Sequence, residues 1–471
     1  MMNPDELELC FASATNLLQR FKSKDLSPVD VVAAMIKRAE EITPSVNPYA
    51  DTFFEQAYDT AVLAEQRYQK GTALPLDGLP LLIKDNVPIK GTRATVGSNI
   101  HVNSVADASD PSVDRLLHNG SIFLARSTCP EFCWLYCCYS RLWGVTRNPW
   151  RLDISPGGSS GGSAAALACG GTTLAIGTDS TGSTRQPASQ CGVVGYKPPF
   201  GRNPAHYAAS YLTYNSAGPM ARTVNDIVLM QNVMSGQHAL DPYSQPKDET
   251  LVVPTGDIKG KRIACSMDLG CYEIDPDVRQ SLQDTIAVLE DAGATVEHVE
   301  IDWAEEAIEL AHKSEIFLML NVFEDVAENH LDQVSGYMHD VIARARSVSP
   351  LDYGRAKSIA GEVWHTHLGP LFEQYDALIT PTVSCPEVPV ENGPFDPIEV
   401  NGKKVTDTDT SMNALFNMFN QCPALSVPCG LTRRGLPVGA QVVSKPYDDQ
   451  TVMDIGRAIE SGVSPLGLPK I

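Results

Sequence analysis

The chain has 471 residues, 43% of them hydrophobic, and a formal net charge of −21 at pH 7. This length and composition suit a globular protein with a sizeable core. The negative charge argues against nucleic acid or an anionic membrane as a partner, because both attract basic surfaces.

The cellular compartment of the protein is suggested by features that the sequence lacks. The N-terminus is acidic, and no apolar run reaches the roughly 18 residues that cross a bilayer. The 12 cysteines are too dilute for a disulfide framework. We therefore expect a cytoplasmic protein with no signal peptide, no membrane span and free thiols.

Helices are predicted for the N-terminal part. Asn3 to Lys22 has the pattern of one amphipathic helix. Ser27-Pro28 has the residue types of a helix start, and Thr43-Pro44 is expected to end that helix. A third helix is predicted over Phe54 to Lys70, ending at Gly71.

Short buried strands begin after these helices. The apolar run LPLLIK predicts a strand that ends at Lys84. The predicted elements that follow are helices at Ser112–Asn119 and Ser163–Cys169 and strands at Ser121–Ala125, Thr172–Gly177 and Val193–Tyr196.

Residues 236–260 are polar and rich in Pro, Asp and Gly, which predicts a connector. Strand and helix patterns alternate beyond it, and this alternation predicts a parallel or mixed sheet covered by helices. The predicted elements are strands at Arg262–Ser266, Thr295–Ile301, Ala377–Thr380, Ala424–Val427 and Val438–Val443, a helix from Asp275 to Gly293, and helices over much of Ala304–Phe372.

Lys84 is unusual because it ends an apolar strand. A lysine at such a place commonly extends its amine to water. A desolvated lysine instead loses its charge more readily and can act as a base near neutral pH. The strand pattern by itself does not decide between these interpretations.

A Gly/Ser loop, Pro156 to Gly162, runs into a predicted small-residue helix. A flexible linker is one interpretation, but the helix and buried strand that follow favour a loop whose backbone approaches another element closely. The loop also matches G-x-S-x-G with Ser159 as the serine. That nucleophile motif requires an apolar strand before it, and the preceding TRNPWRLDIS is polar and broken by proline.

A second loop, Asp179 to Arg185, follows the predicted strand Thr172–Gly177. It is either a polar turn or a nucleophile loop. In the second case Ser183 attacks the substrate, and its own N–H and those just before it bind the oxyanion.

Three segments together make the chain similar to the amidase signature family. They are DGLPLLIKDN at Asp77–Asn86, SPGGSSGGSAAALA at Ser155–Ala168, and GTDSTGSTRQPASQCGVVGYKP at Gly177–Pro198. Weaker matches follow in the same order at DALITPT, PALSVPCG and GLPVGAQVV. The resemblance covers most of the chain. It implies an α/β fold in which a large, mixed, mostly parallel twisted sheet is covered by helices on both faces.

The same resemblance implies one domain over residues 1–471. Within it, we expect residues 1–75 to form N-terminal helices and residues 76–235 to hold the signature core. Residues 236–260 would be the connector, and residues 261–471 would complete the sheet and the substrate pocket.

A Ser–Ser–Lys triad is the catalytic group that the resemblance implies. Ser183 would be the nucleophile and would form an acyl-enzyme. Ser159, preceded by a cis peptide bond, would relay the proton to Lys84. A serine hydroxyl needs such help because it is a weak nucleophile until a base removes its proton.

By the same resemblance, the backbone N–H groups of Ser180, Thr181, Gly182 and Ser183 would form the oxyanion hole. Thr181 stands where the family commonly has glycine, and a β-branched residue tolerates a positive φ poorly. Asp179 and Arg185 are expected to hold the loop.

Substrate choice is expected to depend on the segment Cys133–Cys138, which replaces the small residues of glutamine-using relatives. Trp134, Leu135 and Tyr136 either pack in the core or form a bulky apolar pocket wall that favours an apolar or aromatic acyl group. We expect these three residues and Ser160 to contact the substrate. The thiols Cys129, Cys133, Cys137 and Cys138 could bind a metal by number alone. They lack the spacing of a zinc site, however, and we expect no metal and no cofactor.

These expectations define an amidase for a small carboxamide, without a nucleic acid or membrane partner, and a homodimer is left open. Three alternatives remain at this point. They are an amide-forming acyl transferase with the same triad, the glutaminase component (the A subunit) of a glutamyl-tRNA amidotransferase, and a non-catalytic binding protein. Amides, carbamates, ureas, hydrazides and esters all remain as substrate classes, because fold does not choose among them.

Overall fold

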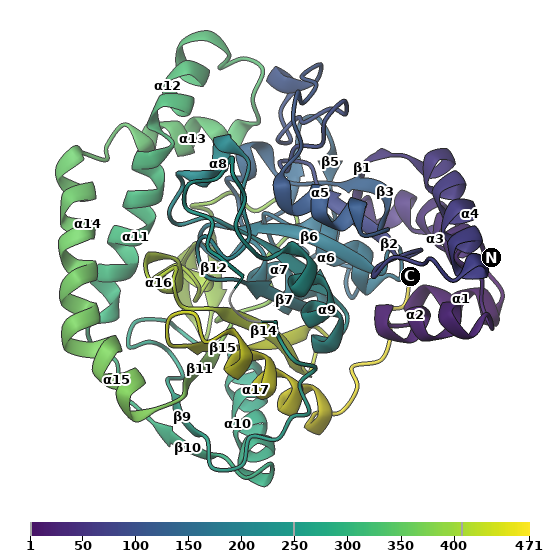
Figure 1. The fold of residues 1–471 in the computed structure, drawn as a ribbon. Coiled ribbons are helices and arrows are strands. Elements are labelled where there is room, and N and C mark those ends of the chain that lie inside the picture. Colours follow the sequence, from purple (N-terminus) through teal and green to yellow (C-terminus); the bar gives the residue numbers. More distant parts are fainter. Residues whose placement is uncertain (1, 248–249, 407) are drawn as a thin grey trace.

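Eleven strands form the central sheet of the computed structural model, which describes residues 2–247, 250–406 and 408–471 (Figure 1). Their order across the sheet is β1-β3-β2-β6-β8-β7-β14-β15-β11-β9-β10. The strands are β1 (Tyr49–Thr52), β2 (Pro80–Lys84), β3 (Ile122–Ser127), β6 (Leu174–Asp179), β7 (Val194–Lys197), β8 (Ser216–Ala221), β9 (Arg262–Cys265), β10 (Thr295–His298), β11 (Ala377–Pro381), β14 (Ala424–Leu431) and β15 (Pro437–Ser444). Two small hairpins lie outside it, β4 (Tyr139–Ser140) with β5 (Gly144–Val145) and β12 (Pro397–Val400) with β13 (Lys403–Thr406).

The α-helices surround this sheet. They are α1 (Pro4–Phe11), α2 (Ala14–Ser23), α3 (Pro28–Val46), α4 (Phe54–Lys70), α5 (Pro111–His118), α6 (Gly161–Ala168), α7 (Arg185–Cys191), α8 (Tyr207–Ser210), α9 (Val224–Met234), α10 (Pro276–Asp291), α11 (Ala304–Leu318), α12 (Leu320–Asn329), α13 (Gly336–Ala345), α14 (Pro350–Val363), α15 (Gly369–Gln374), α16 (Leu415–Met418) and α17 (Asp449–Gly462).

The mixed sheet flanked by helices is confirmed, but the expectation of mostly parallel pairing is wrong. Within the described residues, four neighbouring strand pairs of the large sheet are parallel and six are antiparallel. The strand–helix–strand alternation that suggested parallel pairing applies to β9, α10 and β10. The strands β14 and β15 are instead joined by a short turn, and a short turn connects antiparallel strands.

Local sequence signals explain most helix boundaries. The Ser27 side chain accepts a hydrogen bond from the Val29 N–H and caps α3. Pro44 was expected to end this helix. Pro44 instead lies in the last turn, and the helix ends at Val46. The single helix expected over Asn3–Lys22 is two helices, since Ser13 caps α2 with its own side chain.

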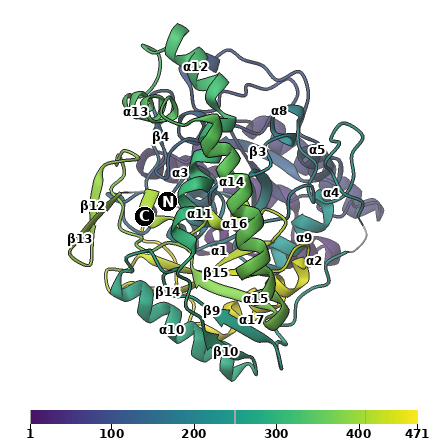
Figure 2. The same cartoon turned by 90° about the vertical axis from the view of Figure 1, so that its left-hand side faces the viewer.

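Helices lie over the sheet in distinct groups. The helices α9, α17 and α10 contact one another in that order, and α6 contacts α7 in a second group. Helices α11 to α15 form a separate group on one side of the molecule, opposite α1 to α4 (Figure 1). The turned view shows α14 in front, and α14 packs against α11 (Figure 2). This arrangement places α11 beside the end of the sheet where the predicted catalytic loops lie.

The core has two parts. The larger apolar cluster includes the strands β2 and β6, whose residues are all buried. A smaller cluster joins α12 and α13 to the segment around Leu135, with Phe323 and Met338 among its buried members. Helices of the described residues are all too short or too polar to cross a membrane.

Candidate active site

Lys84 ends β2 and is fully buried. Its Nζ donates hydrogen bonds to Ser159 Oγ at 2.7 Å and to Thr178 Oγ1 at 2.9 Å. The Asn86 side chain also donates to Thr178 Oγ1, at 3.1 Å. Thr178 therefore fixes the amine on one side, while Ser159 lies within proton-transfer distance on the other.

Ser159 lies in the loop before α6, and the Gly158–Ser159 peptide bond is cis, as the resemblance implied. A side chain on Gly158 would overlap the carbonyl oxygens of Leu135 and Cys137. Glycine is therefore required at position 158, because the loop passes directly over the backbone of the segment expected to bind substrate.

Ser183 lies in the loop between β6 and α7, and 8% of its surface is exposed. The Ser160 N–H donates to the Ser183 carbonyl oxygen at 3.0 Å and so joins the two Gly/Ser loops. The structure thus brings together the three residues expected to form the triad. Lys84 and Ser159 are in direct contact, and Ser183 is linked through the residue that follows Ser159.

The backbone of the nucleophile loop is organised by Asp179. Its carboxylate accepts hydrogen bonds from the N–H groups of Gly182 at 2.8 Å, Thr184 at 3.3 Å and Arg185 at 3.4 Å. The Gly182 N–H was expected in the oxyanion hole, but it already has this partner. The positive φ of the loop, 118°, falls on Gly182, so the loop accommodates Thr181 without a glycine at that position.

Asp179 and Arg185 form a fully buried ion pair at 2.9 Å. Burial alone would raise the pKa of Asp179, but the Arg185 charge and the hydrogen bonds from Arg185 and Asn417 outweigh it and hold this pKa well below its ordinary value. Arg185 also donates to Gln441 on β15 and to Asn417 on α16. The loop is therefore anchored to the C-terminal half of the chain.

A pocket of about 320 Å³ opens over Ser183. Trp134, Leu135 and Tyr136 line one wall, and the Tyr136 hydroxyl donates to the Thr181 carbonyl oxygen at 3.1 Å. Trp134 also packs edge-on against Phe323, with ring centroids 5.2 Å apart. The two interpretations of this segment therefore both apply, because it packs against the smaller core cluster and faces the pocket.

Ser160, also expected to contact substrate, lies elsewhere. It is fully buried, and its hydroxyl contacts the backbone of Thr178 through the Thr178 N–H at 3.3 Å and the carbonyl oxygen at 3.4 Å. Ser160 therefore supports the two loops and does not line the pocket.

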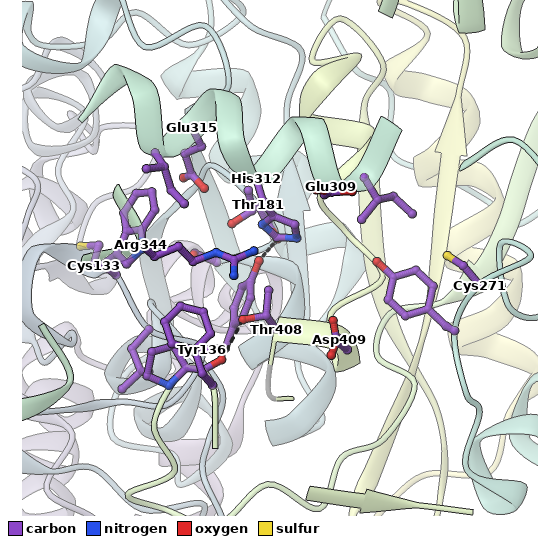
Figure 3. A pocket seen from close by; sticks show the side chains of 18 of the residues that line it. Cys133, Tyr136, Thr181, Cys271, Glu309, His312, Glu315, Arg344, Thr408 and Asp409 are labelled. Atoms are coloured by element: carbon purple, nitrogen blue, oxygen red, sulfur yellow. Dashed lines mark hydrogen bonds between the residues drawn. The ribbon is translucent and has the colours of Figure 1, made fainter. Parts of the chain in front are cut away.

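The opposite wall was not predicted from the sequence. One face of α11 lines it, and Figure 3 shows Glu309, His312 and Glu315 along this helix with Arg344 between His312 and Tyr136. The full set from α11 is Glu305, Ile308, Glu309, His312, Glu315 and Ile316. Their helical spacing identifies a shared face, but spacing does not tell which cavity that face borders.

Two titratable side chains of α11, Glu315 and His312, favour their neutral forms at pH 7. Burial raises the pKa of Glu315 to about 8, against the opposing hydrogen bonds of Thr181 and Ser180. Burial, aided by the Arg344 charge, lowers the pKa of His312 to about 4. Three further carboxylate side chains line the pocket and are exposed: Glu305, Glu309 and Asp409.

The four thiols considered as metal ligands do not form one group. Cys138 Sγ lies 3.8 Å from Thr128 Oγ1, and Cys137 donates to the Pro389 carbonyl oxygen at 3.4 Å. In the part of the chain that the structure describes, no group of three or more His, Cys, Asp or Glu residues is arranged to hold a metal ion.

Comparison with known proteins identifies the class of this fold and site. A model of the amidase family matches residues 30–453, and the chain belongs to this family. It is an amidase-signature hydrolase, a class that acts on the C–N bonds of amides.

Individual relatives cover nearly the whole chain. An acylamidase of Rhodococcus erythropolis is 33% identical over 456 residues, covering 95% of this chain and 94% of the relative. The glutamyl-tRNA(Gln) amidotransferase of Geobacter metallireducens has an A subunit that is 30% identical, with 97% and 98% covered. The crystal structure of a bacterial aryl acylamidase of the amidase signature family has the same fold, with a TM-score of 0.88, 24% identity and 96% of both chains covered.

Replacing Asp179 by Asn should destabilise the fold, because Arg185 then stays buried without its carboxylate. We expect a loss of about 3–5 kcal/mol in unfolding free energy at pH 7, measured by urea denaturation. Since the folded-state pKa of Asp179 is depressed, this stabilisation is present above about pH 4 and is lost as the pH falls further. Asp153→Asn, which breaks an exposed ion pair with Arg151, should change the free energy by less than about 1 kcal/mol. Equal losses in the two variants would contradict the anchoring role of Asp179.

Glu315 should limit activity at alkaline pH. Its ionisation near pH 8 places a negative charge beside Thr181, one of the residues expected to form the oxyanion hole. Two like charges about 6–12 Å apart repel by about 1–3 kcal/mol at an effective dielectric constant near 20, so kcat should fall about tenfold or more above pH 8. Glu315→Gln should remove this fall in a pH–rate profile between pH 6 and 10. The same alkaline fall in the variant would assign it to another group.

Proposed function

We propose that this protein is a serine amidase that hydrolyses small carboxamides through an acyl-enzyme on Ser183. The observation that carries the proposal is the hydrogen bond from Lys84 Nζ to Ser159 Oγ, in a loop that the Ser160 N–H joins to the carbonyl oxygen of Ser183. The motifs that make the chain similar to the amidase signature family support the same roles.

The proposed acylation moves one proton along the two serines. Ser183 Oγ attacks the amide carbonyl carbon as its proton passes to Ser159, and Ser159 gives its own proton to Lys84. A hydroxyl suits this relay because it donates one hydrogen bond and accepts others. The proton then returns to the leaving amine, which departs as the C–N bond breaks. Water repeats the sequence on the acyl-enzyme and releases the acid.

In this proposal the oxyanion hole contains three backbone N–H groups, one fewer than the sequence suggested. Because the Gly182 N–H is bonded to Asp179, the N–H groups of Ser180, Thr181 and Ser183 remain as donors. The removal of one such donor from an enzyme costs about 10²–10³ in kcat, so the positions of these three are expected to matter.

The acyl group is proposed to be apolar or aromatic. Trp134, Leu135 and Tyr136 face Ile308 and Ile316 across the pocket, and such walls favour apolar ligands. The acylamidase relative supports an acyl amide as the substrate class.

Two alternatives use the same first half-reaction. A role as the glutaminase component of a glutamyl-tRNA amidotransferase is a candidate because the Geobacter metallireducens relative is 30% identical over nearly the whole chain. Activity on glutamine above that on benzamide would favour it. An acyl transferase would pass the acyl group to an added amine in preference to water, which product analysis with hydroxylamine measures.

The test of the nucleophile is covalent labelling. A fluorophosphonate probe should label the wild-type protein at Ser183, and Ser183→Ala should abolish labelling and lower kcat by about 10⁴-fold or more. Peptide mapping identifies the labelled residue. Label on another serine in both proteins would overturn the assignment.

The proposed role of Lys84 as the base is tested with a matched pair of lysine variants. Lys84→Met should lower kcat by about 10²–10⁴-fold, the usual contribution of a general base. Lys90→Met, at an exposed position six residues further on, should leave kcat unchanged. Lys90→Met should also unfold at the wild-type urea concentration, and a folded Lys84→Met enzyme with wild-type kcat would contradict the relay.

The pocket wall gives a prediction about acyl preference. Trp134→Ala should lower kcat/KM for benzamide by about 10- to 200-fold, because a hydrophobic contact contributes about 1–3 kcal/mol to discrimination. Acetamide does not reach this wall and serves as the control, with a change of less than about threefold. Equal losses for both amides would show that Trp134 supports the fold and does not select the substrate.

A further inference from the structure

Arg344 brings a positive charge to the pocket over Ser183. It lies on α13, whose buried residues all belong to the smaller core cluster and hold the helix in place. The Arg344 side chain is exposed and lines the pocket, and Figure 3 shows its guanidinium between His312 and Tyr136. Of the described residues that line this pocket, Arg344 is the only lysine or arginine. A ligand in the pocket therefore meets one permanent cation on a firmly packed helix.

The N–H groups of this guanidinium are free to bind a ligand. Arg346, on the same helix, donates two hydrogen bonds to the Glu324 carboxylate, each at 2.9 Å. Within residues 2–247, 250–406 and 408–471, no side chain pairs with Arg344 in this way. The Arg344 Cζ atom lies instead over the Phe395 ring, 5.2 Å from its centroid. Stacking orients the planar guanidinium and leaves the N–H groups at its edges available for a bidentate contact.

Three exposed carboxylates line the same pocket and act against an anionic ligand. Glu309 forms an ion pair at 2.7 Å with a lysine one turn further along α11. Asp409 accepts hydrogen bonds from the N–H of Thr406 at 2.9 Å and from its hydroxyl at 2.7 Å. Glu305 is exposed to solvent, which screens its charge. A ligand carboxylate in direct contact with Arg344 is attracted more strongly than these groups repel it, because Coulomb energies fall with distance.

Apolar side chains supply other parts of the lining. Trp134 and Leu135 come from one wall, and Ile308 and Ile316 come from α11. Such surfaces accept the body of an apolar or aromatic ligand, whereas a planar guanidinium matches a carboxylate through two parallel hydrogen bonds. The pocket thus combines a place for an apolar body with a place for an acidic group on the same ligand.

We propose that Arg344 determines specificity and that the substrate is a carboxamide whose acyl group carries a carboxylate. The inference rests on the proposed function, since it describes the acyl group that Ser183 would take up. Arg344 binds the carboxylate with two N–H groups, while Phe395 holds the guanidinium in position. The reaction itself is unchanged: water cleaves the amide C–N bond, and the products are a dicarboxylate and an amine or ammonia.

Kinetics on matched amides test this preference. The wild-type protein should have a kcat/KM at least about tenfold higher for the better of 3- and 4-carboxybenzamide than for benzamide. Arg344→Met should lower this ratio by about 10- to 150-fold, because hydrogen bonds between charged groups are lost. Arg346→Met, the matched control, breaks an ion pair on the same helix and should leave the ratio unchanged. The same fall in both variants, or in neither, would overturn the proposal.

Two further substrates test the sign of the charge and its place in the substrate. The wild-type protein should prefer the carboxybenzamides to 4-(aminomethyl)benzamide, and Arg344→Glu should reverse this order. A wild-type preference for the cationic amide would show that the pocket carboxylates dominate and would overturn the proposal. N-Benzoylglycine carries its carboxylate on the amine side. If Arg344→Met affects this amide and not the carboxybenzamides, the assignment of the carboxylate to the acyl group is wrong.

Binding to the Ser183→Ala protein separates this inference from the proposed function. Calorimetry should show at least about tenfold tighter binding of the preferred carboxybenzamide than of benzamide, and adding Arg344→Met should remove the difference. If binding follows this pattern but the wild-type protein hydrolyses none of the amides, the carboxylate site stands and the proposed function fails. If the wild-type protein hydrolyses benzamide through Ser183 and Arg344→Met alters neither binding nor the kcat/KM ratio, this inference fails and the proposed function stands.

Discussion

The buried ion pair of Asp179 and Arg185 is the interaction on which the site depends most. Two charges this deep are stable only when their remaining hydrogen-bonding groups are satisfied. Here the partners come from the nucleophile loop itself and from Asn417 and Gln441, far along the chain. The pair therefore positions the loop and joins the two halves of the sheet around it.

The proposed relay depends on a second constraint, the close approach of three backbone segments. Lys84 lies at the end of β2 and contacts Ser159. The loop of Ser159 passes over the backbone of Leu135 and Cys137. The Ser160 N–H donates a hydrogen bond to the carbonyl oxygen of Ser183. Apart from the Lys84 side chain, these contacts use backbone atoms and small residues. A change of substrate-facing side chains can therefore leave the relay geometry unaltered.

The sequence predicts which residues of the proposed relay lie together better than it predicts the pocket. Lys84, Ser159 and Ser183 lie in short motifs whose order identifies the family, and capping residues such as Ser27 mark helix starts because their hydrogen bonds are local. Strand neighbours and the pocket wall are tertiary features. The antiparallel pairings and the pocket face of α11 were missed because they depend on how distant segments dock. The division of the chain into an N-terminal part, a core and a connector remains a prediction.

The origin of the pocket walls has a consequence for how such proteins diversify. One wall comes from residues 134–136 and the other from α11, with further residues from the β12–β13 region. None of these segments carries the proposed nucleophile, relay serine or base. Selection can therefore act on molecular recognition and on bond-breaking chemistry as separate traits. A lineage with this architecture can acquire new nutrients or detoxify new compounds by exchanging a helix face, while its inherited reaction centre stays the same.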